Sequence, residues 1–367
     1  MTGIGGARSR EEYYMRMALS LARRGTGLVS PNPRVGCVIV DYGASEARVA
    51  SLGFHGRYGG PHAETEAIGN ALGPVRGMTA YVTLEPCCHT GHTPPCCDAL
   101  ISAGIARVVM GMTDPDPRVS GGGTAMLEAA GVEVVSGVLR EECERLNRGF
   151  VKRVTEGRPW VTIKAAVSMD GDIALENGGS KWITGPEARR KAHSMRAEND
   201  VVLVGIGTVT KDDPELSVRD SDGRSPIRAV VDKNLEIPLG AKVLRGGERV
   251  IFTSSGARSE KISELTKMGV RVIKSGTRGG RIPPGEILGE LAAMGANYVM
   301  VEGGAGLISS FVEAGHADGA AFFTAPKLMG SGVRVTKFQV PSMDSAVKLK
   351  NLRVKPVGAD FLLEGEF

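Results

Sequence analysis

The chain has 367 residues, of which 42% are hydrophobic and 23% charged, and its formal net charge is +4. This length exceeds what one hydrophobic core usually serves, so we expect two folded domains. The small net charge and the lack of a dense Lys/Arg run exclude a broad nucleic-acid surface. The sequence contains neither a membrane-spanning apolar run nor a signal-peptide core, so we expect a cytoplasmic protein without a membrane partner.

Helical and strand patterns alternate through the first half and predict a layered α/β domain. The expected helices cover residues 11–24, 62–72, 96–103, 123–130 and 141–153, and the expected strands cover 35–40, 48–54, 79–84, 106–112 and 132–137. Prolines flank Asn32, which suits either a plain turn or an asparagine presented to a ligand. The acidic loop at residues 114–117 could contact a substrate, but a solvated turn is the preferred interpretation.

Potential metal ligands gather around the third predicted strand. His62 and Glu64 lie in the first turn of a predicted helix. Two cysteine pairs follow the strand, at Cys87, Cys88, Cys96 and Cys97. One His and two thiolates could hold Zn²⁺ with an open fourth position, and a nearby Glu could move protons as in zinc deaminases. The gap of eight residues between Cys87 and Cys96 departs from the usual deaminase spacing and leaves the choice within each pair open.

A new alternation of strands and helices begins near residue 158 and predicts a second α/β domain. Strands are expected at 161–167, 201–204, 228–231, 249–252, 271–273 and 298–301, and helices at 187–197, 258–268, 284–294 and 307–314. Strand-like stretches at 320–324 and 347–363 predict an antiparallel edge. The Gly-rich segment 302–307 could place backbone N–H groups against phosphates, or could be a tight turn alone.

Each half of the chain contains several short motifs. The first half contains Pro-Asn-Pro-Arg-Val-Gly-Cys-Val-Ile-Val at 31–40, His-Ala-Glu at 62–64, and the cysteine stretches at 83–87 and 93–96. The second half contains Lys164, Ser168, Asp170-Gly171, Trp182-Ile183-Thr184, Gly207-Thr208-Val209 and Asp212-Asp213-Pro214. Together they closely resemble the bacterial bifunctional pyrimidine deaminase/reductase family of riboflavin biosynthesis. The resemblance covers nearly the whole chain in the same domain order.

This resemblance implies an α/β protein with two domains. Residues 1–157 would form a cytidine-deaminase-like three-layer domain, and residues 158–367 a dihydrofolate-reductase-like domain. The implied zinc ligands are His62, Cys87 and Cys96, with Glu64 as the catalytic residue that transfers protons. Cys88 and Cys97 would stay unligated.

For the second domain the resemblance implies NADPH as cofactor. The implied NADPH contacts are Ala166, Trp182, Thr208, Asp212, Gly304, Ala305, Gly306, Leu307, Ile308, Ser309 and Ser310. The expected substrate contacts are Asn32 in the first domain and, in the second, Lys164, Ser180, Arg196, Leu216, Arg219 and Glu302. Arg196 and Arg219 could hold a sugar phosphate through forked hydrogen bonds, and Lys164 and Asp212 are candidates to support hydride transfer. Asp172 stands where the family often has a basic residue.

The implied function is two successive steps of riboflavin biosynthesis. The first is zinc-dependent deamination of 2,5-diamino-6-ribosylamino-4(3H)-pyrimidinone 5′-phosphate, and the second is reduction of the ribosyl group to ribityl with NADPH. We expect a homo-oligomer that acts on this small molecule and binds no nucleic acid. One alternative is a polynucleotide deaminase, which the 5% aromatic content disfavours. Another is a structural zinc protein with a ligand-binding module, in which His89, His92, Cys88 or Cys97 complete the metal shell.

Overall fold

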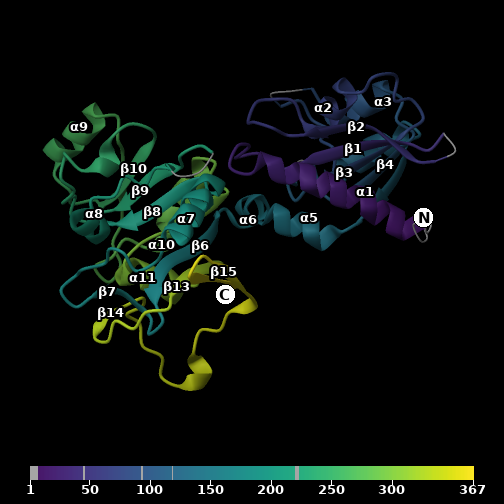
Figure 1. The fold of residues 1–367 in the computed structure, drawn as a ribbon. Coiled ribbons are helices and arrows are strands. Elements are labelled where there is room, and N and C mark those ends of the chain that lie inside the picture. The colour runs from purple at the N-terminus through teal and green to yellow at the C-terminus, as the bar shows by residue number, and fades with distance from the viewer. Residues whose placement is uncertain (1–6, 44–45, 92–93, 118, 220–222) are drawn as a thin grey trace. The chain divides into compact units, whose positions relative to one another are not determined.

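The computed structural model describes residues 7–43, 46–91, 94–117, 119–219 and 223–367. The chain forms two compact units, Met1–Glu156 and Gly157–Phe367, and each has its own sheet (Figure 1). Within the described ranges, no helix combines the length and the apolar character needed to cross a membrane.

The first unit is built on a five-stranded sheet with the order β2-β1-β3-β4-β5. Its strands are β1 (Gly36–Asp41), β2 (Arg48–Phe54), β3 (Thr79–Leu84), β4 (Arg107–Met112) and β5 (Glu133–Ser136). β1 runs antiparallel to β2 and β3, whereas β3, β4 and β5 are parallel. The carboxyl ends of β3 and β4 therefore meet at one edge of the sheet, where the cysteine stretch and the acidic loop begin.

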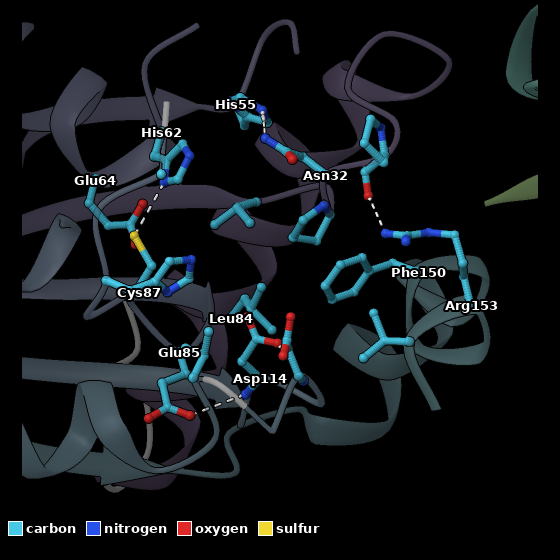
Figure 2. Close-up of a pocket in the computed structure, with 18 of the residues that line it drawn as sticks. Asn32, His55, His62, Glu64, Leu84, Glu85, Cys87, Asp114, Phe150 and Arg153 are labelled. Atoms are coloured by element: carbon cyan, nitrogen blue, oxygen red, sulfur yellow. Dashed lines mark hydrogen bonds between the residues drawn. The ribbon is translucent and has the colours of Figure 1, made fainter. Parts of the chain in front are cut away.

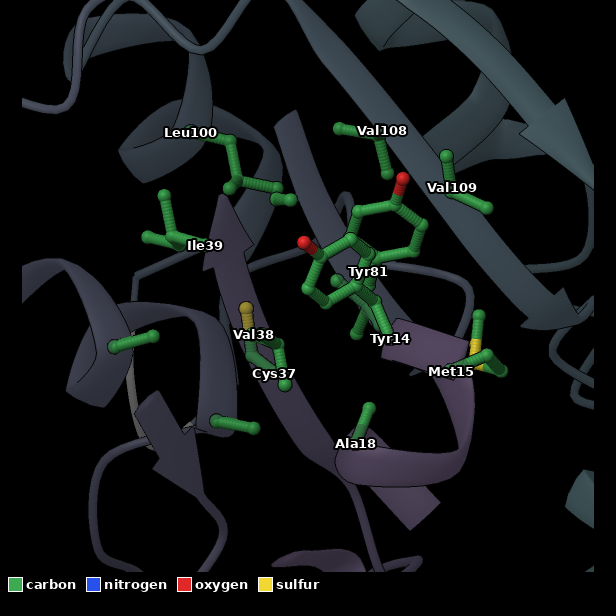
Figure 3. Packing of buried hydrophobic residues seen from close by; sticks show 14 of the residues in the cluster. Tyr14, Met15, Ala18, Cys37, Val38, Ile39, Tyr81, Leu100, Val108 and Val109 are labelled. Carbon is green, nitrogen blue, oxygen red and sulfur yellow. The ribbon is translucent and has the colours of Figure 1, made fainter. Parts of the chain in front are cut away.

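Helices cover both faces of this sheet and make three layers (Figure 1). They are α1 (Ala7–Ala22), α2 (Ala63–Gly69), α3 (Cys96–Ser102), α4 (Gly122–Ala129), α5 (Arg140–Leu146) and α6 (Arg148–Glu156). α1 and α5 pack together over β4, while α2, α3 and α4 follow one another on the other side. The buried faces of the strands, rich in Val and Ile, form one continuous core between these layers (Figure 3).

The single helix predicted at residues 141–153 is two helices in the structure, because the chain breaks at Asn147. The Asn147 side chain is buried; its Oδ1 accepts from the Arg34 backbone N–H at 2.8 Å, and its Nδ2 donates to the Arg34 carbonyl at 2.9 Å. Both bonds reach a segment more than a hundred residues away. The break therefore depends on a tertiary contact that local periodicity does not reveal.

Close backbone packing fixes α2, the helix whose N-terminus carries His62 and Glu64. At Gly53 on β2, an added Cβ would lie 2.3 Å from the Ala63 carbonyl oxygen and 2.4 Å from the Ala67 nitrogen. Only glycine allows the helix to lie this near the strand, since such distances are far inside van der Waals contact. The first turn of α2 is thus held against the sheet.

The second unit contains a nine-stranded sheet with the order β11-β10-β9-β8-β12-β6-β13-β16-β15. Its strands are β6 (Trp160–Ser168), β8 (Val201–Gly205), β9 (Ile227–Val231), β10 (Arg249–Ser254), β11 (Arg271–Ser275), β12 (Tyr298–Val301), β13 (Gly319–Ala325), β15 (Lys350–Val357) and β16 (Asp360–Glu366). The seven strands from β11 to β13 are parallel, and β16 and β15 add an antiparallel edge. The predicted edge is confirmed for the tail, whereas β13 also pairs in parallel with β6.

Two hydrophobic clusters cover the two faces of this sheet. The helices are α7 (Pro186–Glu198), α8 (Ile206–Asp212), α9 (Ser259–Lys267), α10 (Pro284–Ala293) and α11 (Ala305–Glu313). α7, α8 and α9 contribute to one cluster, and α10 and α11 contribute to the other. A two-stranded sheet of β7 (Asp172–Leu175) and β14 (Gly332–Arg334), absent from the sequence predictions, lies beside this core.

Candidate functional site

Three potential metal ligands converge in the first unit. His62 is the N-cap of α2, Cys87 follows β3, and Cys96 is the first residue of α3. His62 Nδ1 lies 3.2 Å from Cys96 Sγ and 3.6 Å from Cys87 Sγ, and the three ligand atoms lie within 4.8 Å of one another. One nitrogen and two sulfur donors match a catalytic zinc site with an open fourth position. The residues present therefore fit zinc.

The other two cysteines of the stretch point elsewhere. Cys97 is buried, and its thiol donates to the Pro86 carbonyl oxygen at 3.3 Å. Cys88 packs on the hydrophobic core, where a Cβ at Gly122 would lie 2.8 Å from its sulfur. Of the described His, Cys, Asp and Glu side chains, only His62, Cys87 and Cys96 form such a group. His92 lies outside the described residues.

Electrostatics at this cluster favour a thiolate at Cys87 and a proton-exchanging carboxyl group at Glu64. A hydrogen bond from the Cys96 thiol, together with His62, lowers the pKa of Cys87 to about 4, and the same hydrogen bond raises the pKa of Cys96. Glu64 is 3% exposed in the first turn of α2. Burial and the nearby Cys87 charge raise the pKa of Glu64 to about 7. A carboxyl group with such a pKa can both accept and release a proton near neutral pH.

The cluster opens into a cavity of about 350 Å³, a size that holds a small organic ligand (Figure 2). The lining side chains come from the turn after α1, the β3 and β4 ends and α6. Asn32 is among them, and its Nδ2 donates to His55 Nε2 at 3.1 Å. His55 Nδ1 in turn donates to the Pro61 carbonyl oxygen at 2.8 Å, and burial lowers the His55 pKa. His55 is therefore held as a neutral imidazole that orients the Asn32 amide.

A buried ion-pair cluster forms at the end of β12 in the second unit. Arg196 holds the Glu302 carboxylate with two hydrogen bonds, Nε to Oε1 at 2.6 Å and Nη2 to Oε2 at 2.8 Å. Lys164 Nζ on β6 lies 3.5 Å from Glu302 Oε2. Burial alone would raise the pKa of Glu302, but the charges of Lys164 and Arg196 outweigh burial and hold this pKa at about 2.

The glycine turn after Glu302 leaves open space beside the start of α11. Gly304 is the N-cap of this helix, and a Cβ at Gly304 or Gly306 would meet nothing within 4 Å. β8 and β12 are parallel neighbours, so the segments that follow them lie at the same edge of the sheet. Thr208 and Asp212 lie on α8 after β8, and Ser180 Oγ donates to Asp212 Oδ1 at 3.2 Å. This open edge and the exposed helix N-terminus fit a phosphate-bearing dinucleotide.

Comparisons with known proteins agree in both units. Residues 8–112 match the cytidine and deoxycytidylate deaminase zinc-binding region, and residues 159–363 match the RibD C-terminal domain. The riboflavin biosynthesis protein RibD of Aquifex aeolicus is 41% identical, over 97% of this chain and 98% of that protein. RibD of Escherichia coli strain K12 is 39% identical, over 96% of this chain and 98% of that protein. The chain belongs to the RibD family.

Solved structures of the family extend the likeness to the fold. A diaminohydroxyphosphoribosylaminopyrimidine deaminase/5-amino-6-(5-phosphoribosylamino)uracil reductase from Thermotoga maritima has a TM-score of 0.88 at 37% identity, over 98% of this chain and 99% of that one. RibD of Acinetobacter baumannii has a TM-score of 0.89 at 35% identity, with the same coverage of both chains. The expected fold class is confirmed, with a cytidine-deaminase-like unit followed by a RibD-type, dihydrofolate-reductase-like unit. This chain is a bifunctional enzyme, a zinc-dependent deaminase and an NADPH-dependent reductase.

One interpretation of the sequence was wrong. The acidic loop is not a solvated turn at Asp114, whose side chain is 7% exposed and lines the deaminase cavity. The Asp114 backbone N–H donates to Glu85 Oε2 at 3.2 Å, which draws the loop inward, and burial raises the Asp114 pKa to about 6. The two Asp-Pro pairs of this loop indicated a rigid turn. Its burial could not be predicted, because the buried partner Glu85 lies 29 residues earlier.

The role in phosphate binding predicted for Arg196 has no support in this geometry. Its Nε and Nη2 bind Glu302, and its Nη1 donates to the Ser217 carbonyl oxygen at 3.2 Å. Arg219, the second predicted phosphate ligand, is exposed and pairs with Glu215 at 2.7 Å. Leu216, three residues before Arg219, is buried and has a positive φ of 56°. Arg196 thus holds the Glu302 carboxylate, and the substrate contacts predicted for Arg196 and Arg219 both stay predictions.

The predicted NADPH residues divide by the direction of their side chains. Ala166 lies on β6, and the ring of the exposed Trp182 lies 4.4 Å from the Arg189 guanidinium. The side chains of the α11 turn are mostly directed inward or bonded locally: Ala305 and Ile308 are buried, Leu307 packs on Gly303, Ser309 Oγ accepts from the Lys337 N–H, and Ser310 Oγ donates to the Leu307 carbonyl oxygen. The space beside this turn is open at Gly304 and Gly306, and the NADPH contacts predicted for it stay predictions.

Asp172, the residue that departs from the family pattern, is fully buried at the start of β7. Its backbone N–H donates to Ser168 Oγ at 3.0 Å. Arg334 on the paired strand β14 places its Nε 3.6 Å from Asp172 Oδ1. The acidic residue thus has an ion-pair partner on the neighbouring short strand, but neither of its carboxylate oxygens accepts a hydrogen bond from the described residues.

Zinc content distinguishes the cysteines that bind the metal. Cys87→Ala should remove most of the bound zinc, because it leaves only two of three protein ligands. Cys88→Ala should retain zinc, since its sulfur packs on the core and does not join the group. Elemental analysis of the two purified variants measures this. Equal loss of zinc in both would contradict the assignment.

Unfolding at two pH values tests the Glu302 cluster. The pKa of Glu302 falls from an ordinary 4.5 to about 2, so its ionised form contributes stability above pH 4.5 that is lost as the pH falls toward 2. Glu302→Gln should lower the free energy of unfolding by about 3 kcal/mol at pH 7, because two cations stay buried without their partner. The difference in this free energy between the variant and the unaltered protein should be smaller at pH 3.

Glu215→Gln is the matched control, because it removes an exposed carboxylate that also pairs with an arginine. Exposed pairs contribute about 1 kcal/mol or less. Denaturant unfolding measures the free energy of unfolding of the two variants and the unaltered protein. If Glu302→Gln lowered it at pH 7 as little as Glu215→Gln does, the cluster would not be stabilising.

Proposed function

We propose that this enzyme deaminates 2,5-diamino-6-ribosylamino-4(3H)-pyrimidinone 5′-phosphate in residues 1–157 and reduces the ribosyl group of the product in residues 158–367. The observation that carries the proposal is the grouping of Cys96 with His62 and Cys87, two residues that line one cavity together with the buried Glu64. The Thermotoga maritima neighbour, whose name states both activities, supports the choice of substrate.

In the first unit we assign metal binding to His62, Cys87 and Cys96. Zinc, when bound there, supplies the Lewis acidity that activates a water molecule near neutral pH. Glu64 takes the proton of that water and gives it to the departing amino group, a role suited to a buried carboxyl group with a pKa of about 7. Asn32, oriented by neutral His55, holds the ring against this group.

In the second unit we assign NADPH to the open edge formed by α8 and the α11 turn. NADPH, when bound, supplies the hydride, and the protein must orient the ribosyl group and provide a proton. Lys164 is the candidate for this second role, because Glu302 holds its ammonium group near the end of β12. Ser180 and Asp212, joined by a hydrogen bond, would fix the segment that carries Trp182.

We also propose that the enzyme works in the cytoplasm as a homo-oligomer and without nucleic acid. Six free cysteines, two of them assigned as metal ligands, suit a reducing compartment. The edge strand β15 supports oligomerisation, since Leu352 and Val354 on it are both 56% exposed. The net charge of +4 supports a small-molecule substrate over a polynucleotide.

Glu64→Gln should abolish ammonia release while zinc stays bound. Losing a general acid–base group costs about 10²- to 10⁴-fold in rate. Oxidation of NADPH with the deaminated intermediate serves as an internal control, because the reductase unit has its own fold and should be unaffected. Unchanged ammonia release by the variant would remove the catalytic assignment of Glu64.

The double substitution Leu352→Glu and Val354→Glu should reduce the molar mass measured by light scattering to that of one chain, because charges on an edge strand oppose pairing. Leu72→Glu, at a fully exposed position of the first unit, is the control and should leave the mass unchanged. A monomeric unaltered protein would contradict the proposed oligomer.

A further inference from the structure

The deaminase cavity has an uneven distribution of charge. Its described lining residues include four acidic side chains, Glu64, Glu85, Asp114 and Asp116. Among these described residues, Arg153 is the one lining residue with a permanent positive charge. A phosphorylated substrate carries about two negative charges near neutral pH, so such a cavity needs a cation where the phosphate lies.

Arg153 is held in place at the wall of the cavity. It lies in the last turn of α6, and its Nη2 donates to the Pro31 carbonyl oxygen at 2.9 Å. The guanidinium also lies 5.8 Å from the centre of the Phe150 ring, one turn earlier on the helix. Arg153 therefore joins α6 to the turn that carries Asn32. A planar guanidinium in a fixed orientation is the preferred protein group for binding phosphate.

The position of Arg153 suits the far end of a pyrimidine ribosyl phosphate. Figure 2 shows Arg153 and Phe150 on one side of the cavity, and His62, Glu64 and Cys87 on the other. With the ring at the metal group, the ribosyl phosphate would extend toward Phe150 and Arg153. The phosphate is the part of the substrate that does not react, so binding it there leaves the chemistry at Glu64 unobstructed.

The wall that carries Arg153 lies outside the region that matches the general deaminase family. The match to the cytidine and deoxycytidylate deaminase zinc-binding region ends at residue 112, whereas α6 begins at Arg148. The metal group and Glu64 lie inside the matched region, and Phe150, Arg153 and Val154 lie outside it. The later segment can therefore adapt a general base-deaminating site to one substrate class.

We propose that Arg153 binds the 5′-phosphate of the deaminase substrate and so makes the first unit selective for a phosphorylated pyrimidine. This assignment rests on the proposed function, because it takes the substrate to be a ribosyl phosphate. It adds a specificity-determining residue to the deaminase site, separate from any phosphate ligand of the reductase unit.

The test compares ammonia release from the phosphorylated substrate and from its dephosphorylated nucleoside, with zinc-loaded full-length enzyme. Arg153→Gln should raise KM for the phosphorylated compound about 10- to 100-fold, the range for one hydrogen bond to a charged group. The change in kcat should stay within about threefold, because Arg153 does not contact the reacting atoms. KM for the nucleoside should stay nearly constant.

Two further variants sharpen the result. Arg153→Lys keeps the charge but loses the planar fork, so it should recover part of the preference for the phosphorylated compound. Arg145→Gln removes an exposed positive charge on α5 that does not line the cavity, and it should behave like the unaltered enzyme.

Equal increases of KM for both compounds in Arg153→Gln would overturn the proposal, because they would mean that Arg153 only supports the wall. No change in either KM would overturn it as well. If the unaltered enzyme released no ammonia from either compound, the proposed function itself would fail, and the assignment of Arg153 would fall with it.

Discussion

The deaminase site depends on one buried carboxylate, that of Glu85 at the end of β3. It accepts hydrogen bonds from the backbone N–H groups of Asp114, Gly121 and Thr124, at 3.2, 3.1 and 3.0 Å, and from the Thr124 hydroxyl at 3.2 Å. A carboxylate with several N–H donors is well compensated for its burial. Because Cys87 follows two residues later, the same anchor sets the cysteine loop, the acidic loop and the start of α4 relative to one another.

Backbone packing then completes the geometry that Glu85 begins. At Gly123 in α4, a Cβ would lie 2.1 Å from the Pro86 carbonyl oxygen, so this helix rests directly on the chain between Glu85 and Cys87. Gly53 gives α2 the same close approach to β2 on the side of His62. The metal ligands therefore come from segments that are fixed by contacts of main chain on main chain, and little movement is left for the ligand atoms.

The sequence predicted those parts of the molecule that local patterns determine. Strands of Val and Ile and amphipathic helices were found nearly at their observed bounds, and family resemblance named the zinc ligands. Spacing could not choose between Cys96 and Cys97, because adjacent residues of a helix differ by about 100° in direction. Only the packing of α3 shows that Cys97 faces the core.

What the sequence could not show was decided by contacts between distant residues. Asp114 was taken for a solvated residue because Glu85, its partner, is remote in sequence. The pairing of Arg196 with Glu302 was not predicted, because an isolated arginine gives no sign that a carboxylate 106 residues later will bind its guanidinium. The break at Asn147 has the same origin.

The contacts of Asn147 also limit how the first unit can be divided. A fragment that stopped at Met112 would retain all three metal ligands and Glu64, yet it would lack α5, α6 and the Asn147 bonds to Arg34. The zinc centre and one wall of its pocket thus come from different stretches of the same unit, because Phe150, Arg153 and Val154 all lie on its last helix.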